Sequence, residues 1–68
     1  MNELILPIEP LLNISEVALI LKISKTSVYR LAQAGELPAV RFGEAIVRVR
    51  QVDLERYILE HLSKAEIT

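Results

Sequence analysis

The sequence predicts a single small domain that is mainly α-helical and carries one β-hairpin. Two short amphipathic segments, each preceded by a capping residue, occupy residues 14–34. A period-two pattern on either side of Gly43 predicts the hairpin, and a third helical segment begins near Asp53. The chain has 68 residues, of which 51% are hydrophobic, so it has the length of one domain and enough apolar side chains for a core.

The first helix is predicted to begin at about Ile14. Asn13 is a good N-cap, and Glu16 follows three residues later, which is the spacing of a capping box. The apolar residues that recur with the spacing of one buried helical face are Ile14, Val17, Ala18 and Leu21. We expect this helix to end at Lys22 and Ile23.

The second helix is predicted over residues 25–34, between the N-cap Ser24 and Gly35, which stands where a left-handed stop is expected. The side chains that point away from its apolar side are Thr26, Arg30 and Gln33, with Tyr29 on the flank. Arginine can bond guanine with two hydrogen bonds, glutamine can bond adenine, and threonine can meet thymine. This face therefore suits base edges, although an ordinary solvated helix face has a similar composition.

The hairpin is predicted from the stretches 39–42 and 46–50, joined by a turn at residues 43–45. In the second stretch arginines alternate with β-branched residues, so that Ile46, Arg48 and Arg50 share one side. Val47 and Val49 share the other side. The hairpin therefore has a cationic side, which is typical of a wing that holds phosphate.

Taken in order, these elements resemble a known family. The residues that carry the resemblance are Leu11-Leu12-Asn13, Glu16-Val17-Ala18, residues 24–31, Gly35-Glu36-Leu37-Pro38, Gly43 in the hairpin and Asp53-Leu54-Glu55. At this spacing they resemble the excisionase-type, or MerR-like, winged helix-turn-helix domains over about residues 11–62. The resemblance implies a helix, a recognition helix in the major groove, a two-stranded wing on the backbone or an adjacent groove, and a closing helix.

The resemblance also implies two sets of DNA contacts. The base-facing candidates on the second helix are Lys25, Thr26, Ser27, Tyr29, Arg30 and Gln33. The candidates on the wing are Arg41, Arg48 and Arg50. Two positions depart from the family pattern: the wing tip has Glu44-Ala45 where basic residues are usual, and Leu19 replaces a commonly charged residue. Because a carboxylate repels phosphate, we expect the tip to stay out of the groove.

The chain is expected to divide into three regions. Residues 1–10 form an apolar and acidic N-terminal segment, residues 11–63 the winged helix-turn-helix domain, and residues 64–68 a C-terminal tail. The stretch Leu4-Ile5-Leu6-Pro7-Ile8 is more apolar than a free tail should be, and Leu19 and Leu59 lie off the buried faces of their helices. We expect some of these residues to cover the core and others to contact a second protomer.

The inventory of reactive side chains argues against an enzyme. The chain has no cysteine, one histidine, one aspartate and no phosphate-binding glycine loop. His61 shares a helix face with Tyr57 and Ile58, which indicates packing rather than metal binding. We expect no catalytic site, metal or cofactor. No run of about 18 apolar residues predicts a membrane span, and the lack of cysteine fits the cytoplasm.

The net charge of −1 is low for a DNA-binding protein. Residues 22–56, however, hold seven basic and four acidic side chains, so the positive charge is concentrated in the predicted domain. Such a face neutralises few phosphates, and we therefore expect several copies to bind cooperatively. A chain of 68 residues leaves no room for the long dimerisation helix of full-length MerR regulators, which favours side-by-side or head-to-tail binding.

The expected function is sequence-specific binding of double-stranded DNA, by an excisionase-like recombination directionality factor or by a small transcriptional regulator. The expected partners are double-stranded DNA, further copies of the chain on that DNA, and an integrase or other recombination protein. The alternative is a protein-interaction module on the same scaffold, which binds a recombinase or repressor through the apolar N-terminal segment and Leu19.

Overall fold

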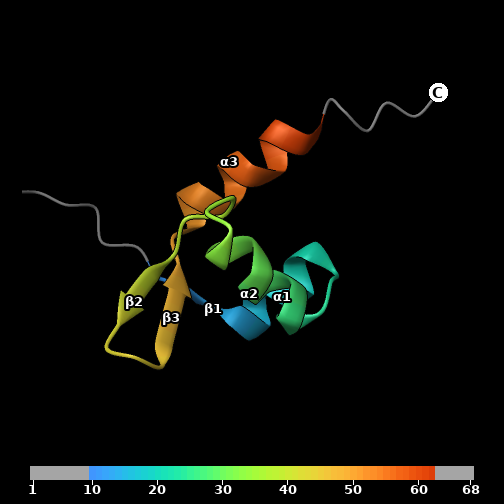
Figure 1. Cartoon of the computed structure of the whole chain (residues 1–68). Helices are drawn as coiled ribbons and strands as arrows, with labels where there is room; N and C mark the ends of the chain where they lie inside the picture. Colours follow the sequence, from blue (N-terminus) through green and yellow to red (C-terminus); the bar gives the residue numbers. More distant parts are fainter. Residues whose placement is uncertain (1–9, 63–68) are drawn as a thin grey trace, which may run out of the picture.

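The computed structural model describes residues 10–62, and the N-terminal stretch Leu4-Ile5-Leu6-Pro7-Ile8 lies outside them. Three helices and three short strands follow one another along the chain (Figure 1). They are β1 (Leu12–Asn13), α1 (Ile14–Leu21), α2 (Lys25–Gln33), β2 (Val40–Phe42), β3 (Ile46–Val49) and α3 (Gln51–Leu62). The expected winged helix-turn-helix architecture is confirmed.

Helix α1 begins and ends at the expected residues. The side-chain Oδ1 of Asn13 accepts a hydrogen bond from the backbone N–H of Glu16 at 2.8 Å, and the Asn13 N–H donates to Glu16 Oε1 at 2.8 Å. These two bonds are the predicted capping box. The helix ends at Lys22, which adopts a left-handed conformation with φ of 57°. Since lysine rarely adopts this conformation, the turn between α1 and α2 carries a small strain.

Helix α2 is also capped by hydrogen bonds at both ends. Ser24 Oγ accepts a hydrogen bond from the N–H of Ser27 at 3.0 Å, which satisfies one donor of the first turn. At the other end Gly35 has φ of 80°, and the N–H of Glu36 donates to the Leu31 carbonyl at 3.0 Å. The expected glycine stop is confirmed.

The sheet has one strand more than expected. β2 and β3 form the antiparallel hairpin, with Phe42 paired to Ile46 and a turn that contains Gly43 at φ of 72°. β1 pairs with the opposite edge of β3, so that the strand order is β1-β3-β2 and β3 lies in the centre. β1 was not predicted because two residues are too few to show an alternating pattern, and because its partner strand β3 lies far away in the sequence.

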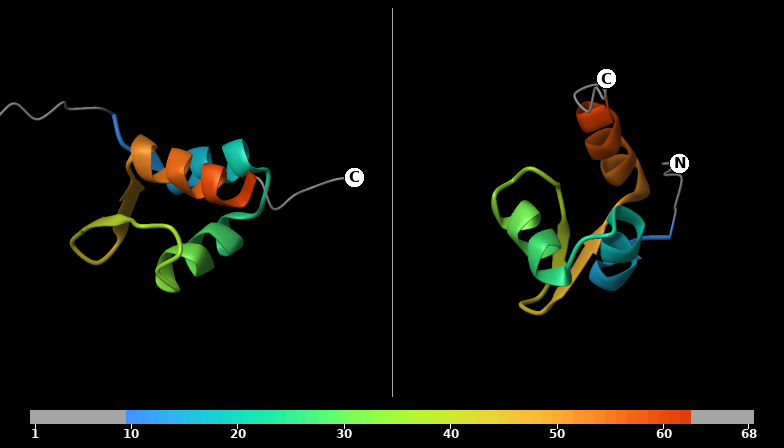
Figure 2. Two further views of the ribbon diagram at one scale, coloured as in Figure 1. Left: turned by 90° about the horizontal axis from the view of Figure 1, so that it is seen from above. Right: turned by 90° about the vertical axis from the view of Figure 1, so that its right-hand side faces the viewer.

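The buried core joins α1, α2, β3 and the first turn of α3. Its members are Ile14, Val17, Ala18, Val28, Leu37, Val47, Val49 and Leu54. Leu37 comes from the connection between α2 and β2, and it is completely buried. The views in Figures 1 and 2 show α1 and α2 on one side of the sheet and the hairpin extending beyond them. Within residues 10–62, no helix is both long enough and apolar enough to cross a membrane.

Candidate nucleic-acid interface

Helix α2 presents a polar face directly opposite its buried side. Val28 is completely buried, whereas Thr26, Arg30 and Gln33 are exposed. Within residues 10–62, these three side chains make no hydrogen bond or ion pair with the rest of the domain. Tyr29 is 45% exposed beside them. The face is held on a capped helix, and its hydrogen-bonding groups are available to a ligand.

The start of α2 carries the other two candidates of this helix. Lys25 is exposed at the first helical position. Ser27 is half-buried, and its Oγ accepts a hydrogen bond from the Oγ of Ser24 at 2.9 Å. Ser27 therefore contributes to the cap of the helix, which leaves its own hydroxyl hydrogen for another acceptor.

The wing arginines do not all lie on one face of the sheet. Residues directly opposite one another in an antiparallel pair point to the same side. Arg41 is opposite Val47, which faces the core, whereas Arg48 is opposite Val40 on one neighbour and Asn13 on the other. Arg41 is exposed on the edge strand, and Arg48 is half-buried with a guanidinium N–H donating to the Val47 carbonyl at 3.0 Å. The two cations therefore leave the wing in different directions.

Arg50 lies just after β3 and is bonded to Asp53 inside the domain. Its Nε donates to Asp53 Oδ2 at 2.6 Å, and a terminal nitrogen donates to Oδ1 at 2.9 Å. Asp53 is only 4% exposed, and Arg56 lies 3.7 Å from its second oxygen. The hydrogen bond from Arg50 is the main reason that the pKa of Asp53 is lowered, and it outweighs the effect of burial.

Asp53 lies in the first turn of α3, near the predicted start of the last helix, and it has a structural role there. Beyond that, it joins the end of β3 to the first turn of α3 through Arg50. The sequence signal for this pair was Arg50 three residues before Asp53, which is a spacing that brings side chains together at a helix start. Because the Arg50 guanidinium is already held by a carboxylate, its contact with phosphate stays a prediction.

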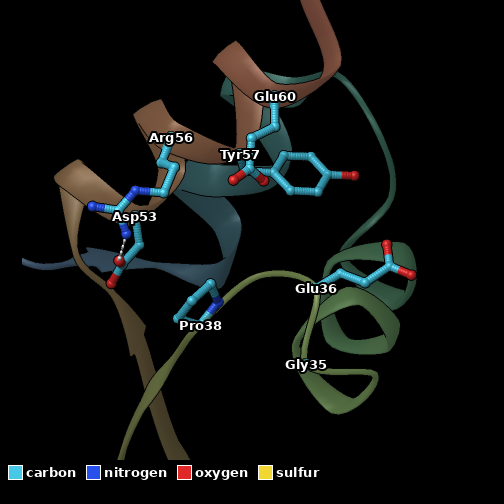
Figure 3. Close-up of a pocket in the computed structure, with 7 residues that line it drawn as sticks. All are labelled: Gly35, Glu36, Pro38, Asp53, Arg56, Tyr57 and Glu60. Atoms are coloured by element: carbon cyan, nitrogen blue, oxygen red, sulfur yellow. Dashed lines mark ion pairs between the residues drawn. The ribbon is translucent and has the colours of Figure 1, made fainter. Parts of the chain in front are cut away.

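A small hollow on another side of the domain is bordered by acidic side chains. It has a volume of about 220 Å³ and lies between α3 and the connection from α2 to β2 (Figure 3). The residues that line it are Gly35, Glu36, Pro38, Asp53, Arg56, Tyr57 and Glu60. Three carboxylates against one arginine disfavour DNA phosphate, so this hollow is not part of the candidate interface.

The wing tip combines an acidic residue with apolar ones. Glu44 and Ala45 are exposed in the turn, and the adjacent pair Phe42 and Ile46 is 48% and 47% exposed. The exposed tip therefore has no basic side chain between β2 and β3. The expectation that the tip stays out of a groove remains a prediction.

His61 packs against its own helix. Its ring centroid lies 4.2 Å from that of Tyr57, and its Nδ1 is 2.8 Å from the Tyr57 carbonyl oxygen. Among the described residues, no group of three or more histidine, cysteine, aspartate or glutamate side chains is arranged to hold a metal ion.

Comparison with known proteins identifies the domain. Two proteins of Mycobacterium tuberculosis, from strains CDC 1551 / Oshkosh and H37Rv, are each 54% identical to this chain over 35 residues. Both have names that provisionally describe them as DNA-binding proteins. The match covers 52% of this chain and 45% of each relative, so it spans about half the length of these proteins. The helix-turn-helix domain family matches residues 11–62, which is most of the chain, and the chain therefore belongs to the helix-turn-helix domain family.

Proposed function

We propose that this protein binds double-stranded DNA at specific sequences, with α2 in the major groove. The observation that carries the proposal is the exposed face of α2, where Thr26, Arg30 and Gln33 make no bond within the described part of the chain. Side chains of these types can distinguish base pairs by their hydrogen-bonding edges. Membership of the helix-turn-helix family and the names of the two relatives support this role.

The remaining candidates, three cations and Tyr29, would hold the helix in position. Lys25 at the start of α2 and Tyr29 on its flank are exposed, and we expect them to contact the DNA beside Arg30, at a base edge or at the neighbouring phosphate. Arg41 and Arg48 on the wing would contact phosphates on either side of the sheet, because the register sends them to opposite faces. Contacts of this kind set the position of a protein on the duplex but carry no sequence information of their own.

The modest charge of the domain favours the binding of several copies. Few phosphates are neutralised by one copy, so the affinity of a single domain is low and depends only weakly on salt. Adjacent copies on repeated sites would supply the missing affinity. We propose that the protein acts in this way either as an excisionase-like directionality factor, beside an integrase, or as a small transcriptional regulator.

The test begins with a selection of bound duplexes from a random pool, followed by fluorescence anisotropy on the enriched site. Arg30→Ala is expected to weaken binding by about 1–3 kcal/mol, or roughly 5- to 150-fold, and to relax the preference at one base pair. Arg56→Ala is the matched control, because it removes the same charge from an exposed position on α3. The proposal would be refuted if the selection enriched no sequence and if the wild type, Arg30→Ala and Arg56→Ala bound DNA with equal affinity.

Arg48→Ala separates the role of the wing from that of α2. If Arg48 contacts phosphate, this variant binds all sequences more weakly and its affinity depends less steeply on salt concentration. The base preference of the selected site should stay unchanged. A change in base preference with an unchanged salt dependence would contradict the phosphate contact.

A protein-interaction module is the second candidate function. The observation that favours it is Leu19, which is 75% exposed on α1. In that case Leu19→Glu would abolish binding of a recombinase or repressor, while the affinity of a single copy for DNA would be unchanged. The loss of partner binding can be measured by pull-down with an integrase from the same genome, using the wild type and Leu19→Glu side by side.

A further inference from the structure

Lys22, in the turn between α1 and α2, is the one residue other than glycine that has a positive φ among residues 10–62. Its φ is 57° and its ψ is 45°, and it is the C-cap of α1. Glycine is the usual residue at such a position, because a Cβ atom there crowds the following carbonyl oxygen. Just after α2, where φ is 80°, the chain has Gly35. The domain thus meets a similar backbone demand with glycine at one helix end and with lysine at the other.

The lysine side chain brings no contact inside the domain that would offset this strain. It is exposed, and it makes no hydrogen bond or ion pair with another of residues 10–62. The turn itself is closed by the backbone, since the N–H groups of Lys22 and Ile23 both donate to the Ala18 carbonyl. Any residue other than proline could supply these bonds. A strained backbone position without a structural reason for its side chain points to a function for that side chain.

The surroundings of Lys22 favour an anion. Lys22 borders a hollow of about 420 Å³ whose other lining residues are Ser15, Ala18, Leu19, Ile23 and Lys25. None of these residues is acidic, and α2 contains no acidic residue. Glu16 is the acidic residue of α1, and its side chain is bonded to the Asn13 N–H at the other end of that helix. Two lysines without a carboxylate between them repel one another, and an anion that contacts both would relieve the repulsion.

We propose that Lys22 is a further DNA contact, whose ammonium group binds a backbone phosphate beside the major groove that α2 enters. In a helix-turn-helix the first helix crosses the phosphate backbone, and the N-terminal residues of the second contact base edges. Lys22 lies directly after α1 and three residues before Lys25, the first residue of α2, so it stands between these two regions. This contact rests on the proposed binding of DNA by α2. Lysine at this turn lowers the stability of the free domain and raises its affinity for DNA.

Three substitutions at this position separate the backbone strain from the charge. Lys22→Gly relieves the strain and removes the charge, Lys22→Gln keeps the strain and removes the charge, and Lys22→Arg keeps both. Thermal unfolding without DNA measures the strain. Lys22→Gly should raise Tm by about 2–8 °C, whereas the other two variants should unfold close to the wild type.

Fluorescence anisotropy on a duplex with one selected site measures the charge. Lys22→Gly and Lys22→Gln should both bind about 5- to 10-fold more weakly at about 0.1 M salt, because one lost phosphate contact lowers the slope of log K against log salt by about 0.9. Lys22→Arg should bind as the wild type does, and the base preference should stay the same in all variants. Arg56→Ala is again the control, because it removes a positive charge from an exposed position on α3.

The combined result expected is a glycine variant that is more stable than the wild type and binds DNA less tightly. The proposal is overturned if Lys22→Gly and Lys22→Gln bind with the affinity and salt dependence of the wild type, and the DNA-binding function then stands. A loss of affinity in Lys22→Gly without one in Lys22→Gln would assign the effect to the backbone, and a lower Tm for Lys22→Gly would assign lysine to the turn itself; either result also overturns the proposal. If the wild type binds no DNA, the function and this contact are both wrong.

Discussion

The ion pair between Arg50 and Asp53 should contribute measurably to the stability of the domain. We consider the substitution Asp53→Asn, which keeps the size of the side chain and one acceptor oxygen but removes the negative charge. In the native protein the carboxylate is 4% exposed and accepts two hydrogen bonds from Arg50, at 2.6 and 2.9 Å. The variant therefore loses the negative charge and keeps at most one of the two hydrogen bonds from Arg50, at a buried position.

The expected size of the effect follows from the exposure of the two partners. A hydrogen bond to a charged group contributes about 1.5–3 kcal/mol, but Arg50 is 56% exposed, so water already screens the pair. We therefore expect Asp53→Asn to lower the free energy of unfolding by about 1–2 kcal/mol, equivalent to roughly 4–16 °C in Tm for a domain of this size. Arg50→Ala should cost more, because the ion pair that the buried carboxylate then retains within residues 10–62 is the longer one with Arg56, at 3.7 Å.

The dependence on pH tests the same pair. The hydrogen bond from Arg50 lowers the pKa of Asp53 below its ordinary value of 3.8. The ionised Asp53 side chain therefore contributes its full stabilisation above pH 3.8, the ordinary pKa. That stabilisation is lost as the pH falls through the lower pKa that Asp53 has in the folded protein. The difference in stability between the wild type and Asp53→Asn should be constant near neutral pH and shrink only in acid.

Urea unfolding followed by circular dichroism, repeated from neutral to acidic pH, measures these quantities. Arg56→Ala is the control, since this exposed arginine lies 3.7 Å from the Asp53 carboxylate and its loss should change stability by about 0–1 kcal/mol. Equal stability of the wild type and Asp53→Asn would refute the reasoning. So would a difference between them that persists unchanged in strong acid.

Substitutions at three further positions test the parts of the fold that position α2. Leu37→Ala should lower the free energy of unfolding by about 2–5 kcal/mol, because this side chain is completely buried, and thermal unfolding would show it. Asn13→Ala should cost about 1 kcal/mol by removing the capping box, whereas Asn13→Asp should keep it; helical circular dichroism during urea unfolding compares the two. Gly35→Ala should cost about 1–2 kcal/mol in the same urea assay, from its φ of 80° alone, since nothing lies within 4 Å of an added Cβ. An unchanged midpoint for any of the three alanine variants would contradict the role assigned to that residue.

The elements that depend on local chemistry could be predicted from the sequence. Asn13, Ser24 and Gly35 mark helix ends through bonds to residues three or four positions away, and each does so in the structure. The period of two placed Val47 and Val49 together on one side of the second hairpin strand, and in the structure both are buried in the core. Such signals are local and therefore visible in a single sequence.

Features that join distant residues could not be predicted. β1 exists because Leu12 pairs with Val49, and nothing in a two-residue stretch indicates such a partner. The register of the hairpin, which separates Arg41 from Arg48, depends on which residues face one another across the turn. The candidate side chains of α2 were named from their helical positions alone, and their contacts with DNA stay predictions.

The pairing of β1 with β3 has a mechanical consequence. Asn13 lies opposite Arg48 in the sheet and is also the N-cap of α1, so the strand passes into the helix without a linker. This direct connection holds the hairpin of β2 and β3 at a fixed distance from α1 and from α2, which packs on α1. A duplex that contacts both must match that separation, and if it has to bend to do so, the cost of bending depends on its base steps. Flexible pyrimidine–purine steps between the two contacts would then be preferred at positions that the protein never touches.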